Sequence, residues 1–184
     1  MISCMIEAME VQKVATTNIP EYFLQNDYAK GDIHIKLEGA MVTLLEYIDP
    51  EYYKYFIYTD KRGRKCTYAE LKKAIYGKLE ALLLFWEKLS KSQEEMGYKR
   101  NKYDWCIMTK IIDNKQCTIL WNVDDLKKSH VDPAIISSVL ADIDAEYGKI
   151  AKSTITQGKV NKYLGMNIDY SLPSKVILLM IEYI

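Results

Sequence analysis

The chain has 184 residues, of which 49% are hydrophobic and 27% are charged, and its 25 basic residues balance its 25 acidic ones. This composition excludes a disordered tail, a collagen-like fibre and a disulfide-stapled scaffold, while the length suits one domain with a hydrophobic core. The neutral total hides a division, because residues 1–60 hold 4 basic and 10 acidic residues, whereas residues 61–110 hold 13 and 6. A surface for a polyanion is therefore expected in the middle of the chain.

The sequence shows neither a targeting segment nor a zinc motif. No apolar run reaches the roughly 18 residues of a membrane-spanning helix, and the first residues do not form a signal peptide. The four cysteines lack the CxxC spacing that holds zinc. We therefore expect reduced thiols in an intracellular protein that has no membrane partner.

Two helices carry the clearest local signals. Thr67 and Glu70 match a capping box, and apolar residues follow at spacings of three and four until Gly97. This pattern predicts a long helix that opens at Thr67, with a break expected near Gly77, where glycine weakens a helix. A second helix is predicted from a cap at Asp132 to a stop at Gly148.

Segments rich in β-branched and aromatic residues predict strands around these helices. They lie at residues 13–18, 31–37, 105–112, 117–123, 126–131, 163–170 and 175–180. Asp113 and Asn114 are expected to form a hairpin turn between two of them. Tyr47–Tyr58, which holds five tyrosines, is interpreted as an amphipathic helical turn with aromatic packing. Because helices and strands mix without a regular βαβ rhythm, we predict the α+β fold class.

Two adjacent carboxylates are the local feature that most clearly suggests a functional site. An apolar strand ends at Trp121–Val123, runs into Asp124 and Asp125, and is followed by a second short strand. At the tip of a hairpin two such carboxylates can converge on one ion, and hard oxygen ligands suit Mg²⁺. A two-metal phosphoryl-transfer site also needs a third carboxylate that bridges the ions. The alternative interpretation is a solvated turn that binds no metal.

Five segments, in this order, resemble the motifs of one family. Val14–Gln25 resembles a first catalytic motif in which an Asp precedes Ala-Phe-Leu, and Trp121–Asp125 resembles a Val-Asp-Asp motif. The other matches are Ile33–Gly39 with the strand that follows the first motif, Glu70–Gly77 with a Lys-Ala-Leu-Tyr-Gly segment, and 158–166 with a Phe-Leu-Gly-Ile segment. Over nearly all of its length the chain thus resembles the palm region of copia-type retrotransposon reverse transcriptases.

This resemblance implies RNA- or DNA-templated addition of deoxynucleotides, with Mg²⁺ held by Asp124 and Asp125. The position of the family's first catalytic Asp is Asn18 in this chain. A neutral amide cannot replace the anion that bridges two cations, and losing one electrostatic group of this kind commonly costs about 10²–10³ in rate. We therefore expect this copy of an RNA-directed DNA polymerase to be inactive.

The resemblance also implies a nucleotide-binding set. Phe23 would be an aromatic gate beneath the incoming sugar, while Lys73, Tyr76 and Gly77 would lie near the template and nucleotide. Lys159 would contact a phosphate or donate a proton. The implied partners are an RNA or DNA template-primer and a deoxynucleoside triphosphate, in a cytoplasmic particle or the nucleus.

The implied fold is a palm, an antiparallel sheet with packed helices, incomplete fingers and no thumb, in a single partial domain over residues 1–184. A different function class stays open, namely a small non-catalytic α+β binding module that contacts a nucleic-acid backbone through residues 61–110. Lys61–Lys65 supports this module, although the same residues also suit a solvated hairpin turn.

Overall fold

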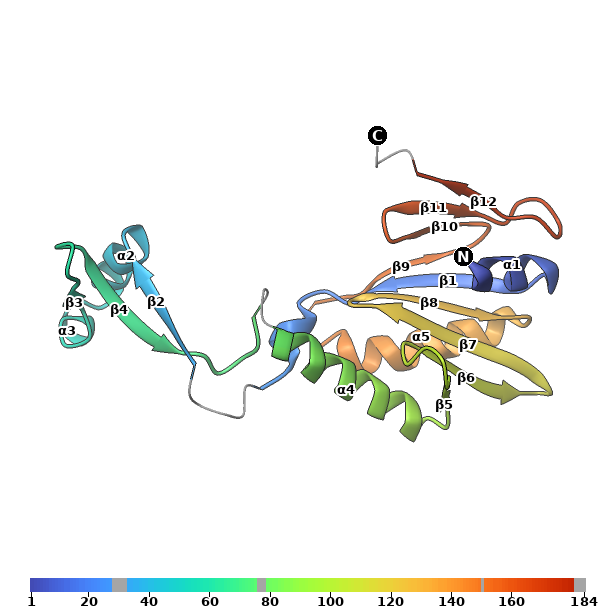
Figure 1. Cartoon of the computed structure of the whole chain (residues 1–184), viewed down its shortest axis with the longest axis horizontal. Helices are drawn as coiled ribbons and strands as arrows, with labels where there is room; N and C mark the ends of the chain where they lie inside the picture. The colour runs from blue at the N-terminus through green and yellow to red at the C-terminus, as the bar shows by residue number, and fades with distance from the viewer. Residues whose placement is uncertain (28–32, 76–78, 150, 181–184) are drawn as a thin grey trace.

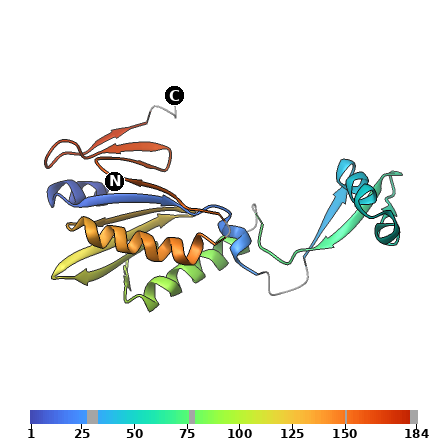
Figure 2. The ribbon, with the colours of Figure 1, turned by 180° about the vertical axis from the view of Figure 1, so that it is seen from behind.

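The computed structural model describes residues 1–27, 33–75, 79–149 and 151–180 (Figure 1). These residues form a main body and a smaller lobe at residues 34–70. Figures 1 and 2 show the lobe standing apart from the main body at one end of the molecule. The main core lies in the main body, so the candidate site is described from there.

A six-stranded antiparallel sheet with the order β5-β6-β7-β8-β1-β9 forms the centre of the main body. Its strands are β1 (Lys13–Asn18), β5 (Lys99–Arg100), β6 (Ile107–Ile112), β7 (Lys115–Asn122), β8 (Asp125–His130) and β9 (Thr154–Gln157). Asp113 and Asn114, with φ of 49° and 59°, join β6 to β7. Positive φ at both positions is typical of the two-residue hairpin turn that matches strand twist, so the predicted turn is confirmed.

Two helices, α4 (Leu79–Glu95) and α5 (Pro133–Tyr147), cover one face of this sheet (Figures 1 and 2). Phe85 of α4 and Ile143 of α5 are buried with Ile119 and Leu126 of the sheet in the main hydrophobic core. Burying an aromatic or aliphatic side chain of this size stabilises the fold by about 1.5–3 kcal/mol. This face therefore holds the main body together.

The predicted start and end of α5 and the predicted end of α4 are confirmed, and in each case nearby residues explain the boundary. The Asp132 carboxylate accepts a hydrogen bond of 2.8 Å from the backbone N–H of Ala134, and Pro133 begins α5. Gly148 follows the last residue of α5. Gly97 lies just beyond α4 with a φ of +88°, a backbone conformation that favours glycine at a helix end.

The predicted helix start at Thr67 is wrong. Thr67 and Glu70 lie in β4 (Lys65–Glu70), where Thr67 is buried and pairs with Leu37 of β2 (His34–Glu38). Long-range pairing with β2 satisfies the backbone groups that a helix cap would otherwise satisfy, and a β-branched threonine suits a strand. The helix begins instead at Leu79.

The lobe is a three-stranded sheet of order β2-β4-β3, with two short helices. Its remaining elements are α2 (Ala40–Ile48), α3 (Pro50–Tyr53) and β3 (Tyr58–Thr59). The helical turn predicted near Tyr47 is present, but the tyrosines are not part of a core, since Tyr47 is 85% exposed. Rings such as Tyr52 and Phe56, 5.0 Å apart, contact each other at the surface instead, because so small a lobe has little interior.

The opposite face of the main sheet meets α1 (Ile2–Met9) and a second three-stranded sheet of order β10-β11-β12. The strands of that sheet are β10 (Val160–Tyr163), β11 (Met166–Asp169) and β12 (Ile177–Leu179). The single strand predicted at residues 163–170 is interrupted, because Leu164 and Gly165 have positive φ and form a turn. A short 3-10 helix, Tyr22–Gln25, follows β1.

Antiparallel sheets packed with helices confirm the predicted α+β fold class. In the part of the chain that the structure describes, no helix is long and apolar enough to cross a membrane.

Candidate carboxylate site

The strand register brings three of the predicted site residues together. Asn18 is the last residue of β1 and pairs with Asp125, the first residue of β8. Val123, with a φ of 55°, and Asp124 form the tight turn between β7 and β8. The backbone N–H of Ile19 donates a hydrogen bond of 2.9 Å to the carbonyl oxygen of Asp124, so this turn is fixed against the end of β1.

The Asn18 amide joins the two carboxylates. Its Nδ2 donates to Asp124 Oδ2 at 3.1 Å and to Asp125 Oδ1 at 2.9 Å. All three side chains are half-buried. Neighbouring strand residues point to opposite faces, but the turn releases Asp124 from that rule, and its carboxylate turns toward the same amide as Asp125. The two carboxylates therefore converge at the hairpin tip.

The residues present do not fit the two-Mg²⁺ centre that the resemblance implies. Such a centre needs a third anionic ligand, and Asn18 instead presents an amide N–H to both carboxylates. A carboxylate without a proton can only accept hydrogen bonds, so the amide nitrogen is the group that must face it. Among the described residues, no group of three or more His, Cys, Asp and Glu side chains could hold a metal ion.

A polar cavity of about 220 Å³ lies beside Asn18 and Asp125. Threonines line it from two neighbouring strands, since Thr154 of β9 pairs with Asn18 and Thr156 pairs with Thr16 of β1. These threonines are not among the site residues predicted from the sequence. Their alternation at positions 154 and 156 was the available signal, because alternate residues line one face of a strand.

Within the described part of the chain, no hydrogen bond or ion pair joins the remaining predicted site residues to the carboxylates. Lys73 forms an exposed ion pair of 2.6 Å with Asp27, and the hydrogen bond from Lys73 holds the pKa of the Asp27 carboxyl below its ordinary value. Phe23 belongs to the 3-10 helix after β1. Tyr76 and Gly77 lie outside the described residues.

Lys159 lies at the other end of β1. Gln157 of β9 pairs with Ala15, whereas Thr154 pairs with Asn18. The chain therefore runs away from the carboxylates as it approaches Lys159. The role of Lys159 as a phosphate contact stays a prediction.

The basic segment of the lobe is a hairpin turn whose charges are partly paired. The Asp60 carboxylate accepts hydrogen bonds from the backbone N–H groups of Arg64 and Arg62, and these hold its pKa far below the ordinary value. The Arg64 guanidinium pairs with Asp60 and Glu38. Lys65 pairs with an acid of α2. The geometry agrees with a solvated turn, and a nucleic-acid contact there stays a prediction.

Two solved structures are similar to this chain. They are apo telomerase from Candida Tropicalis and the same telomerase truncated from its C-terminal domain, each with a TM-score of 0.49 and 11% sequence identity. The similarity covers 96% of this chain, but only 35% and 38% of those chains. This chain thus spans about a third of their length. No protein-family model matches the sequence, and no curated protein does. The copia-type resemblance therefore stays a prediction.

Proposed function

We propose that the chain is the palm of a copia-type, reverse-transcriptase-like polymerase whose catalytic centre is silent. The observation that carries the proposal is the convergence of Asn18, Asp124 and Asp125 at one hairpin tip. The order of the five motif segments supports the family, and the amide at position 18 supports the loss of activity.

The physical argument concerns charge. Two carboxylates that share one amide donor form a closed, hydrogen-bonded group without a bound cation. Where the family uses a third anion to neutralise two metal ions, this chain supplies a neutral side chain, which lowers the affinity for a second divalent cation. We expect no primer extension by the native chain on poly(rA)/oligo(dT) with Mg²⁺. Clear extension would overturn the proposed silence.

The decisive experiment restores the missing charge. In Asn18→Asp three carboxylates would lie where the amide now bridges two, and their mutual repulsion would favour a divalent cation. We expect isothermal titration to detect Mg²⁺ or Mn²⁺ binding by Asn18→Asp, and this binding should be lost in the double variant Asn18→Asp/Asp124→Ala.

A matched control adds the same charge elsewhere. Asn114→Asp makes an identical chemical change at the β6–β7 hairpin turn, whose positive φ an aspartate tolerates. We expect no gain in metal binding from this control. If Asn18→Asp binds no more metal than Asn114→Asp, the hairpin is a solvated turn and the palm proposal loses its site.

The proposal also includes nucleic-acid partners. A silent palm can still bind an RNA or DNA template-primer, in a cytoplasmic particle or the nucleus, with Phe23, Lys73, Tyr76, Gly77 and Lys159 near the nucleotide. The salt dependence of affinity for single-stranded RNA tests this, since each phosphate contact contributes a slope of about −0.7 to the logarithm of the association constant plotted against log salt.

Lys61 and Arg62 are the cations of the basic segment to change first. Both are exposed, and neither forms an ion pair with the described part of the chain. We expect Lys61→Gln/Arg62→Gln to reduce the size of the salt slope by up to about 1.4 if both side chains contact phosphate. An unchanged slope would remove the turn from the interface and leave the alternative binding module without support.

A further inference from the structure

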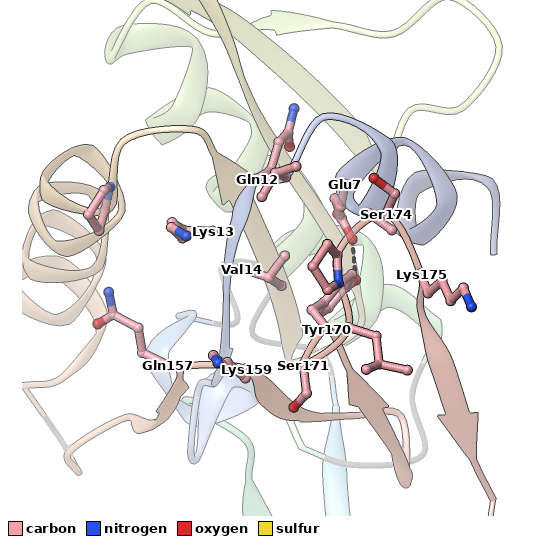
Figure 3. Close-up of a pocket in the computed structure, with 16 residues that line it drawn as sticks. Glu7, Gln12, Lys13, Val14, Gln157, Lys159, Tyr170, Ser171, Ser174 and Lys175 are labelled. Atoms are coloured by element: carbon pink, nitrogen blue, oxygen red, sulfur yellow. Dashed lines mark hydrogen bonds between the residues drawn. The ribbon is translucent and has the colours of Figure 1, made fainter.

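A second cavity, of about 370 Å³, opens at the other end of β1 from the carboxylates (Figure 3). Its walls come from the end of α1, the start of β1, the turn between β9 and β10, and residues 170–175 after β11. The residues that line it include none of those that line the polar cavity beside Asn18. This cavity is therefore separate from the candidate carboxylate site.

The cavity is mostly apolar inside. Ala8, Val11, Val14, Leu172 and Pro173 contribute hydrocarbon surface to it, and Figure 3 shows Val14 near the middle of the group. Cavities with such walls bind the apolar part of small ligands and use a few polar groups to orient them. The interior thus fits an alkyl chain or an aromatic ring.

Three lysines give the lining a positive charge. Lys13, Lys159 and Lys175 are exposed and line the cavity. None of them forms an ion pair or a side-chain hydrogen bond within the part of the chain that the structure describes. Figure 3 shows Lys13 to the left of β1, Val14 to its right, and Lys159 below both, near Ser171. An anionic group at this position would therefore meet ammonium groups that have no other anion bound to them.

The acidic residue of the lining does not cancel this charge. Glu7 is buried, and both of its carboxylate oxygens accept hydrogen bonds from Lys127 Nζ, at 2.6 and 2.7 Å. The Tyr170 hydroxyl donates to the same carboxylate. Outside the lining, Asp169 interacts mainly with Ser171, and the charge of Lys159 contributes to its lowered pKa. The lysines thus dominate the potential of the cavity.

We propose that this cavity binds an amphiphilic monoanion, a medium-chain carboxylate in its simplest form. The apolar tail would pack against Val14 and Leu172, and the carboxylate would lie between Lys13 and Lys159. The site goes beyond the proposed polymerase palm, because it uses neither Asn18 nor the two aspartates, and it gives Lys159 a role other than the nucleotide contact proposed above.

The test compares two probes of equal tail length, decanoate and decanol, with the full chain labelled for ¹⁵N NMR. We expect decanoate to bind about five- to tenfold more tightly than decanol, because each of two exposed ion pairs should strengthen binding by a few-fold. Shift changes should centre on residues 11–14, 157–159 and 171–175. Equal affinities, or shifts confined to the lobe, would overturn the proposal.

Three variants separate the tail from the headgroup. Val14→Trp fills the cavity and should abolish binding of both probes, and Leu172→Trp tests the same point at a half-exposed position if the first variant does not fold. Lys13→Gln/Lys159→Gln should remove the preference for decanoate over decanol. The control Lys102→Gln/Lys115→Gln changes two exposed lysines elsewhere and should keep that preference. A preference that survives the first lysine pair, or falls equally in the control, refutes the site.

Discussion

The two faces of the main sheet differ in chemistry although the same strands build both. On β8, Leu126 faces the apolar core beneath α4 and α5, whereas Asp125 faces the polar side with Asn18. Alternation along a strand produces this division. The apolar face holds the fold together, and the polar face can therefore carry carboxylates, threonines and a buried ion pair.

Two adjacent lysines of β8 show how the two faces of the sheet treat a buried charge differently. Lys127 and Lys128 are both fully buried, on opposite faces of β8. Lys127 is paired with Glu7 of α1, whereas Lys128 Nζ donates to the Thr17 hydroxyl at 2.8 Å and burial lowers its pKa to about 7. The polar face supplies a counter-charge for its lysine, and the apolar face does not.

The largest expected effect comes from breaking the ion pair on the polar face. Glu7→Ala leaves the Lys127 ammonium buried without a counter-charge, which should lower the free energy of unfolding by about 3–5 kcal/mol. Urea denaturation followed by circular dichroism measures it. The apolar pair Glu7→Leu/Lys127→Met should recover most of the loss. Glu95→Ala, which breaks an exposed pair with Lys91, serves as the control and should cost less than about 1 kcal/mol.

The next effect comes from the lysine on the apolar face. An unfolded lysine keeps the ordinary pKa of 10.5, while folded Lys128 has a pKa of about 7. Between these values the unfolded chain binds a proton that the folded chain lacks, so the free energy of unfolding should rise with pH, by at most about 1.4 kcal/mol per pH unit. Lys128→Met should flatten this rise and stabilise the chain at pH 7 by a few kcal/mol.

The difference between native chain and variant isolates Lys128 in this experiment. Burial also raises the pKa of the nearby Cys117 thiol, which has the opposite effect on stability at alkaline pH, but Cys117 is present in both proteins. Lys115→Met, at an exposed position of β7, should keep the native pH slope. An identical slope in Lys128→Met would show that the Lys128 ammonium is not desolvated by the fold.

A smaller effect is expected at the carboxylate site itself. Asn18→Ala removes the amide that donates to Asp124 and Asp125, and should lower the free energy of unfolding by about 1–2 kcal/mol. The loss stays this small because the half-buried carboxylates regain part of their hydration. Asn122→Ala, at an exposed position of the same hairpin, should change stability by less than about 0.5 kcal/mol. Equal effects would mean that the amide bridge contributes nothing specific.

The same comparison separates what could be predicted from the sequence from what could not. The ends of α5 and the β6–β7 turn depend on residues a few positions apart, so Asp132 and Asn114 were sufficient. The strand at Thr67 depends on pairing with β2, which overrides a local capping pattern. The burial of Lys127 depends on Glu7, far away in the sequence, and no local pattern indicates such a partner.

The smallest effect concerns the helix that closes the apolar face. Asp132→Ala removes the side-chain cap of α5 and leaves the Ala134 N–H to water, so it should cost about 1 kcal/mol. Asp132→Ser keeps a capping oxygen and should cost only a few tenths of that. Because α5 packs on the apolar face of β1 and β8, and Asn18 and Asp125 lie on the other face, the loss should lower the thermal midpoint while Mg²⁺ binding by an Asn18→Asp background stays unchanged. A change in that binding would mean that the two faces are energetically coupled.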